Sequence, residues 1–162
     1  MYSMQYDSPL GTLLLTCTDQ GLSGIFWNRE NPKKQANHPV LQETKQWLDA
    51  YFRGENPEVP VPLAPQGTVF QKQVWQLLLS IPYGKTLSYG ALAREMAKIC
   101  GKEKMSAQAV GHAVGKNPIS ILIPCHRVVG TKGQLTGYAG GLETKIRLLR
   151  HEGRQIENHI VL

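Results

Sequence analysis

Four prolines between Glu55 and Gly67 decide how this chain can fold. They are Pro57, Pro60, Pro62 and Pro65. Proline lacks a backbone N–H donor and its ring clashes with the preceding helical turn, so no helix can run through this stretch. We interpret it as an extended connector and place a domain boundary at its end, between residues 1–66 and 67–162.

The net charge of the chain changes at the same place. Residues 1–66 carry five cationic and seven anionic side chains, a net charge of −2, whereas residues 67–162 carry thirteen and five, a net charge of +8. A basic region of this kind favours a polyanionic partner, usually nucleic acid. Charge alone leaves a solvated basic surface open as the alternative.

The sequence shows no feature of a membrane protein, a secreted protein or a metal-binding protein. No stretch approaches the roughly 20 apolar residues that a membrane span needs, and the first residues lack the basic start and apolar run of a secretory signal. Cys17, Cys100 and Cys125 are too few for a disulfide framework, and no Cys/His spacing indicates zinc. We expect a cytoplasmic protein with no membrane association, metal or cofactor.

The first region is predicted to be rich in strands. Gly11–Thr18 and Gly21–Trp27 alternate in polarity and flank Asp19-Gln20, which predicts a hairpin with Gly21 at positive φ. A helix ending near Gly54 follows, predicted by apolar residues at helical spacing: Leu41, Leu48, Tyr51 and Phe52.

The second region is predicted to be mostly helical. Thr68 and Gln71 form a capping box, while Ser88 and Ser106 cap the next two helices. Those two short helices, joined by a glycine-containing segment, have the outline of a helix-turn-helix. The fold class is therefore α/β (α+β): a small strand-rich domain with a helix, then a helical, winged-helix-like domain.

The chain beyond these helices yields three further predictions. The apolar, β-branched run Ile119–Pro124 predicts a buried strand, and Gly130–Gly133 predicts a turn. Residues at helical spacing before Gly153 predict a last amphipathic helix: Leu142, Ile146 and Leu149. Ile156–Leu162 carries no clear signal.

Cys125 follows directly on the predicted buried strand, beside His126 and Arg127. The thiolate is the reactive form of cysteine, and a neighbouring imidazole or cation lowers the thiol pKa or removes its proton. This arrangement indicates a nucleophile at the mouth of a pocket. A buried structural cysteine is the alternative.

The surroundings of Cys125 carry a long pattern of motifs: Asn117-Pro-Ile119, Ile123-Pro-Cys-His-Arg-Val-Val129, Gly137-Tyr-Ala-Gly-Gly141 and His151-Glu-Gly153. Ile81-Pro-Tyr-Gly84 and Ser88-Tyr89-Gly90 precede them. From about Gly67 to Gly153 the chain resembles the O6-alkylguanine-DNA alkyltransferases, suicidal repair proteins that take an alkyl group from guanine onto a cysteine. Residues 1–66 resemble this family more loosely.

The resemblance implies a role for each residue around the thiol. Cys125 is the expected nucleophile, His126 relays its proton through a water, and Glu152 orients His126. Asn117 braces the turn that holds the cysteine. The implied activity is irreversible transfer of one methyl or other small alkyl group from O6-alkylguanine, and from O4-alkylthymine, to Cys125. For Asn117 and Glu152, helix-end capping and surface charge are the alternatives.

The resemblance also implies how the base is held. Tyr89 would hydrogen-bond the guanine ring, and the backbone at Val128 and at Ala139, after Tyr138, would read the base edges. Gly140 and Gly141 would let the backbone approach the base, and Lys145 would bond the backbone of this loop. The alternatives are a half-buried core tyrosine, a plain glycine turn and a surface lysine.

The implied partner is double-stranded DNA containing O6-alkylguanine, bound by a monomer that flips the damaged nucleotide out of the stack. The expected DNA contacts are Ser106, Gln108, Ala109, Gly111 and Arg127. Gln108 stands where the family has an arginine that fills the vacated place in the stack. This departure leaves the efficiency of flipping open, although Lys102, Lys104 and Lys116 lie near enough in sequence to attract phosphates.

Three other functions compete with this interpretation. A thiol hydrolase would use Cys125 and His126 but needs an oxyanion hole, for which the sequence shows no site. A non-catalytic sensor of alkylated DNA is disfavoured by the presence of Cys125. A plain helix-turn-helix regulator leaves Pro124–Val129 unexplained.

Overall fold

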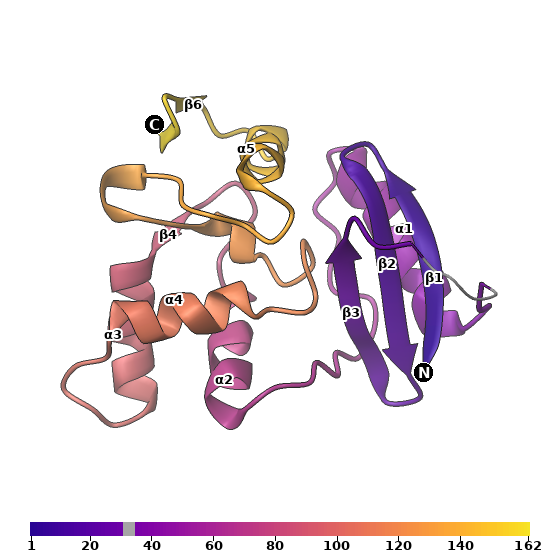
Figure 1. Cartoon of the computed structure of the whole chain (residues 1–162), viewed down its shortest axis with the longest axis horizontal. Helices are drawn as coiled ribbons and strands as arrows, with labels where there is room; N and C mark the ends of the chain where they lie inside the picture. The colour runs from indigo at the N-terminus through magenta and orange to yellow at the C-terminus, as the bar shows by residue number, and fades with distance from the viewer. Residues whose placement is uncertain (31–34) are drawn as a thin grey trace. The chain divides into compact units, whose positions relative to one another are not determined.

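The computed structural model describes residues 1–30 and 35–162. The chain forms two compact units (Figure 1). One unit comprises Met1–Gln66 and Pro118–Leu122, and the other comprises Gly67–Asn117 and Ile123–Leu162. The mixed α/β class is confirmed, with a strand-rich first unit and a mainly helical second one.

The first unit is built on a three-stranded antiparallel sheet in the order β1-β2-β3. The strands are β1 (Tyr2–Ser8), β2 (Gly11–Thr18) and β3 (Gly21–Trp27). The predicted β2–β3 hairpin is confirmed, with Gly21 at φ 149°. Helix α1 (Pro39–Phe52) packs on all three strands and is followed by Gly54 at φ 90°.

Two segments continue the hydrogen bonding of β3, and one of them contradicts a prediction. In the connector, Leu22 N donates to the Pro62 carbonyl at 2.9 Å. The run Ile119–Pro124 is buried as expected, but the predicted strand is wrong: only Ile119 bridges Ile25. Ile121 then turns the chain at φ 69°, a left-handed conformation that ends strand pairing. Pro118–Leu122 therefore belongs to the first unit rather than the second.

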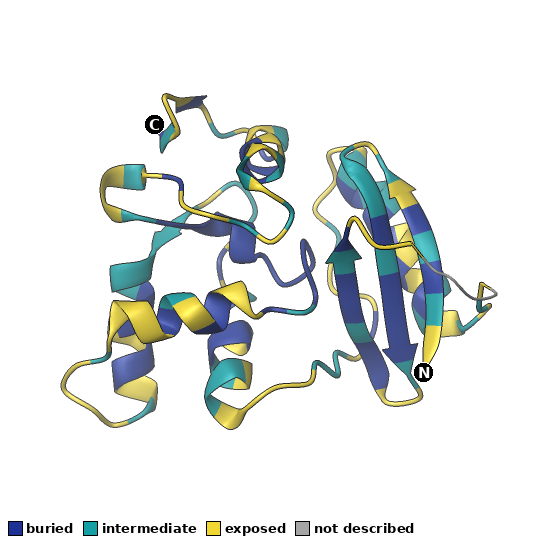
Figure 2. Ribbon diagram, in the orientation of Figure 1, coloured by how far each residue is buried: buried dark blue, intermediate teal, exposed yellow. Residues whose placement is uncertain are grey.

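The second unit is organised by three helices that pack on one another: α2 (Val69–Leu78), α3 (Tyr89–Ile99) and α4 (Ala107–Gly115). The capping box of Thr68 and Gln71 is confirmed, as are the caps Ser88 and Ser106. Figure 2 shows each of these helices with buried residues on one side and exposed residues on the other. Helices α3 and α4 form the predicted helix-turn-helix.

The rest of the second unit contains helix α5 (Leu142–His151), which ends before Gly153 at φ 94°. Short helices η1 (Cys125–Arg127) and η2 (Thr131–Gly133) precede it. Strand β4 (Leu87–Ser88) pairs in parallel with β5 (Val128–Val129). The tail, which lacked a sequence signal, forms the hairpin β6 (Ile156–Glu157) and β7 (Ile160–Val161). Ile156 and Val161 complete a core with Ile146 and Leu149.

Across residues 1–30 and 35–162, no helix combines the length and apolar character needed to cross a membrane.

Candidate active site

Pairing of two short strands places the candidate nucleophile. Cys125 is the first residue of η1, and β5 follows η1 directly. Leu87 of β4 pairs with Val128 of β5, and β4 leads straight into α3. The start of α3, at Tyr89, is therefore held beside the segment that carries Cys125.

These two residues line a cavity of about 460 Å³. Its volume lies within the range of about 300–1,000 Å³ that is typical of small-ligand sites. Seven of the residues predicted for the site line it: Tyr89, Gln108, Gly111, Asn117, Cys125, Tyr138 and Ala139. The cavity is formed by the second unit alone.

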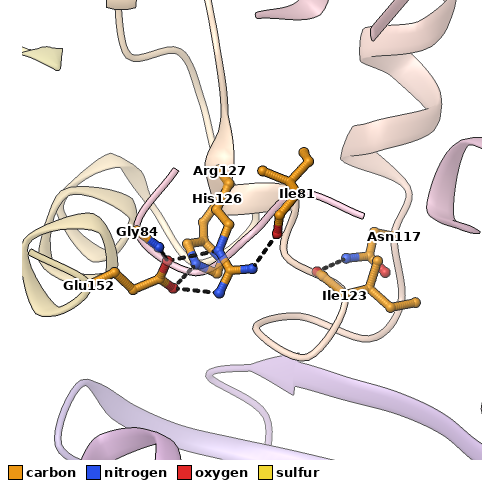
Figure 3. A network of polar contacts seen from close by, with 7 residues as sticks. All are labelled: Ile81, Gly84, Asn117, Ile123, His126, Arg127 and Glu152. Atoms are coloured by element: carbon orange, nitrogen blue, oxygen red, sulfur yellow. Dashed lines mark hydrogen bonds and ion pairs between the residues drawn. The ribbon is translucent and has the colours of Figure 1, made fainter. Parts of the chain in front are cut away.

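A buried carboxylate at the C-terminal end of α5, that of Glu152, binds several polar groups (Figure 3). Glu152 accepts from His126 Nε2 at 2.6 Å, from Arg127 Nε at 2.8 Å and Nη2 at 3.2 Å, and from Gly84 N at 3.1 Å. Glu152 is 6% exposed and His126 is fully buried. Burial excludes the surface-charge alternative for Glu152.

The charge state of Glu152 fixes the tautomer of His126. Burial by itself would raise the pKa of the Glu152 carboxyl, but hydrogen bonds from His126 and Arg127 and the positive charge of Arg127 hold it well below its usual range. An ionised carboxylate only accepts hydrogen bonds, so His126 Nε2 must carry the proton. Burial lowers the pKa of His126 despite the bond to Glu152. The imidazole is therefore neutral at pH 7, with its lone pair on Nδ1.

Nδ1 is the second ring nitrogen of His126. It is buried and has no hydrogen-bond partner within the described part of the chain. A neutral imidazole with an unpaired Nδ1 is ready to accept a proton.

The thiol of Cys125 needs such a base. Burial raises the pKa of Cys125, and a hydrogen bond with the Asn117 side chain and the charge of Lys145 only partly offset this effect. The cysteine is therefore a neutral thiol at rest. Cys125, His126 and Glu152 supply a thiol, a neutral imidazole and an ionised carboxylate, the three kinds of group that a catalytic triad uses.

Asn117 holds the turn before the cysteine. Its Nδ2 donates to the Ile123 carbonyl at 2.9 Å, and the residue is 7% exposed (Figure 3). Because it also bonds the Cys125 side chain, Asn117 fixes both the turn and the thiol.

Comparison with known proteins identifies the family. The 6-O-methylguanine DNA methyltransferase DNA binding domain matches residues 69–154, and the ribonuclease-like domain of the same methyltransferases matches residues 1–65. The chain belongs to the 6-O-methylguanine DNA methyltransferase family.

Similar proteins match this methyltransferase over nearly its whole length. A methylated-DNA–protein-cysteine methyltransferase of Methanosarcina acetivorans is 44% identical, covering 94% of this chain and 99% of the relative. One of Haemophilus influenzae is 42% identical, covering 94% and 86%. The crystal structure of Mycobacterium tuberculosis OGT in complex with DNA superposes with a TM-score of 0.81 at 39% identity, covering 94% and 93%.

Arg127 is the one expected DNA contact that the methyltransferase structure contradicts. Its side chain is 10% exposed, and its guanidinium is used by Glu152 and by the Ile81 carbonyl, which accepts from Nη1 at 2.8 Å. A cation whose donors are committed to buried partners does not reach phosphate. Arg127 is instead part of the buried network around Glu152.

Other predicted residues lie near the cavity without lining it. Val128 is fully buried, and its N–H donates to the Cys125 carbonyl. Lys145 is 1% exposed, which excludes the surface-lysine alternative, and its Nζ lies 6.0 Å from the centre of the Tyr89 ring. Gly140 precedes Gly141, the N-cap residue of α5, which has φ 93°. Ser106 caps α4, because its Oγ accepts a hydrogen bond from Ala109 N at 3.1 Å, and both residues are exposed.

Two groups of site residues were not predicted from sequence. Thr136 lines the cavity beside Gly137, and its Oγ1 lies 3.1 Å from the Tyr89 hydroxyl. The Ile81 carbonyl and Gly84 N–H bind the Arg127–Glu152 pair. The motif Ile81-Pro-Tyr-Gly84 was the available signal for the second group, whereas nothing local marked Thr136.

No group of three or more potential metal-ligating side chains occurs among residues 1–30 and 35–162.

The buried charge of Lys145 predicts a falling rate in alkali. Burial lowers the pKa of Lys145 to about 8, although the neighbouring Cys125 opposes the shift. Above that pH the lysine loses the positive charge that helps to lower the pKa of the thiol. We expect the single-turnover rate with free O6-benzylguanine to fall as pH rises through about 8.

Lys145→Met should react more slowly at neutral pH and should lack this alkaline decline. Stopped-flow rates across the pH range provide the measurement, with exposed Lys72→Met as the matched control. A rate that climbs steadily through pH 8 in the unmodified protein would contradict the assignment.

Proposed function

We propose that this chain repairs O6-alkylguanine in double-stranded DNA by moving the alkyl group irreversibly onto Cys125 Sγ. The observation that carries the proposal is the buried Cys125 thiol in a base-sized cavity, next to a neutral His126 whose free Nδ1 can take its proton. The family name supports the same chemistry. O4-alkylthymine is the expected second substrate.

The proposed reaction is a direct displacement. His126 Nδ1 accepts the thiol proton through one bridging water, while Glu152 holds Nε2–H in place. The Sγ–carbon bond forms as the carbon–O6 bond breaks, and the bonding electron pair passes to the guanine oxygen. The proton finally neutralises the released guanine.

Tyr89 is proposed to stabilise the departing base. Burial raises the pKa of Tyr89, so its hydroxyl keeps its proton at neutral pH and can donate a hydrogen bond to the guanine ring. Thr136 holds that hydroxyl at 3.1 Å. The backbone at Ala139, which lines the cavity, and at Val128 would read the base edges.

DNA is proposed to bind along α4. Gln108 is exposed on the first turn of α4 and lines the cavity, which suits a side chain that fills the place of a flipped nucleotide. Because the proposed site is contained in one unit of one chain, a monomer suffices. We place the protein in the cytoplasm, where a reducing environment keeps Cys125 a thiol.

Intact mass after reaction with a methylated duplex oligonucleotide tests the proposal. We expect one methyl group per molecule, on the peptide that contains Cys125, and no further reaction with excess substrate. Cys125→Ala should bind the duplex and gain no mass. Repeated turnover would favour a thiol hydrolase. If the protein binds the duplex without gaining mass, a non-catalytic sensor would be favoured. Methylation of Cys17 or Cys100 would overturn the assignment of Cys125 as the alkyl acceptor.

A further inference from the structure

Two hydroxyl groups meet at the wall of the cavity that contains Cys125. Tyr89, the first residue of α3, and Thr136, in the loop between η2 and α5, both line this cavity. The phenol oxygen of Tyr89 and Oγ1 of Thr136 lie 3.1 Å apart, and either atom could be the donor. The direction of this hydrogen bond decides what Tyr89 can offer to a bound base.

A phenol has one proton and can donate it to one acceptor. If Tyr89 donated to Thr136, its proton would not be available to the base. A threonine hydroxyl can donate as well as accept, so Thr136 can donate to the phenol oxygen instead. The pKa of Tyr89 agrees with this direction: burial raises it, and the hydrogen bond with Thr136 opposes the rise. A hydrogen bond lowers the pKa of an acid when it stabilises the ionised oxygen.

The backbone that carries Thr136 is anchored, although the residue itself is exposed. The preceding residue, Leu135, is buried, and its N–H donates to the His159 carbonyl of the tail hairpin at 2.8 Å. The methyl group of Thr136 faces Gly130, because a Cβ built on that glycine would lie 3.6 Å from Thr136 Cγ2. This contact leaves Oγ1 free to point toward Tyr89.

We propose that Thr136 is a positioning residue for alkyl transfer, which donates a hydrogen bond to the Tyr89 oxygen and so commits the tyrosine proton to the departing base. This inference rests on the proposed function, since it assumes that Tyr89 donates to the guanine ring. Consecutive hydrogen bonds polarise one another, so a phenol that accepts from Thr136 is a stronger donor. The bond to the base strengthens as the departing guanine gains negative charge, and Thr136 therefore stabilises the transition state more than the bound substrate.

The test removes the hydroxyl of Thr136 while keeping the shape of the side chain. Thr136→Val replaces Oγ1 with a methyl group, and Thr136→Ser restores a hydroxyl. Thr131→Val is the matched control, because Thr131 is exposed in η2 and is not among the residues that line the cavity. The single-turnover rate with free O6-benzylguanine is the measurement, and thermal melting checks that each variant is folded.

We expect Thr136→Val to react about 3–10-fold more slowly, the net contribution of one neutral hydrogen bond. Thr136→Ser should recover most of the rate, and Thr131→Val should react like the unmodified protein. In a Tyr89→Phe background, Thr136→Val should cause no further loss, because the phenol oxygen that it acts on is gone. A change of cavity shape alone would instead slow Tyr89→Phe by the same factor as the unmodified protein.

The leaving group gives a second readout that a purely structural role would not change. An O6-benzylguanine with an electron-withdrawing bromine on C8 departs more readily and needs less stabilisation of its charge. The loss caused by Thr136→Val should therefore be smaller with this substrate than with O6-benzylguanine. The NMR shift of Tyr89 Cζ reports the same hydrogen bond without any reaction and should change in Thr136→Val.

Independent losses in the double variant would overturn the inference, as would a full rate or an unchanged Tyr89 signal in Thr136→Val. A serine variant as slow as the valine variant would also overturn it. None of these results would affect Cys125 as the alkyl acceptor. Failure of the unmodified protein to gain an alkyl group on Cys125 is a different result, because it would remove the proposed function itself.

Discussion

Glu152→Gln should lower the single-turnover rate of alkyl transfer by about 10²–10⁴-fold, the range of a lost general base. Glutamine keeps the shape of the side chain but replaces one acceptor oxygen with an NH₂ donor. Three donors from His126 and Arg127 now meet Glu152, so a donor must face a donor in the variant. His126 escapes this clash by moving its proton to Nδ1, and it then cannot accept the thiol proton.

The rate with free O6-benzylguanine measures this effect without any contribution from DNA binding. Glu143→Gln is the matched control, because Glu143 lies exposed in the first turn of the same helix α5. NMR of the imidazole nitrogens should show the proton on Nε2 in the unmodified protein and on Nδ1 in the variant. A full rate in Glu152→Gln would show that His126 is not the base.

Arg127→Met should lower the free energy of unfolding by about 3–5 kcal/mol, the cost of removing one partner of a buried ion pair. The guanidinium makes two hydrogen bonds to Glu152 and one to the Ile81 carbonyl, at 2.8 to 3.2 Å. Methionine fills much of the volume of the arginine side chain. It leaves the Ile81 carbonyl without a hydrogen-bond donor and the Glu152 carboxylate without the positive charge of the guanidinium. Urea unfolding at neutral pH gives the measurement.

The pH dependence gives this prediction a second readout. Contact with Arg127 helps to hold the pKa of Glu152 below that of the unfolded chain, about 4.3. A depressed carboxyl pKa stabilises the fold above the unfolded pKa, and this stability is lost as pH falls through the folded pKa. The difference between Arg127→Met and the unmodified protein should therefore shrink in acid.

Two further variants separate the interpretations of Arg127. Arg127→Lys should recover only part of the loss, because an ammonium cannot reproduce the forked contacts of a guanidinium. Exposed Arg147→Met is the control for charge and should change stability little. If Arg127→Met unfolds like this control but loses DNA affinity, then the original expectation of a DNA contact was right.

The sequence by itself determined the features that depend on neighbours along the chain. Prolines stopped helix formation between Glu55 and Gly67, and Thr68, Ser88 and Ser106 each capped a helix through a bond three residues ahead. Such signals act within one turn of chain, so they can be recognised without a fold. The motif around Cys125 is also local in sequence, and its resemblance to a family indicated the candidate nucleophile.

Only the tertiary structure decided the features that depend on distant partners. Arg127 looks like a surface cation in sequence, but Glu152 and Ile81, at distant positions in the chain, bury it. Ile119–Pro124 has the composition of a strand, yet a single bridge to Ile25 and the turn at Ile121 set its shape. The tail hairpin exists because Ile156 and Val161 find a core. The burial of a charged side chain and the pairing of distant segments depend on the assembled fold, so no local pattern records them.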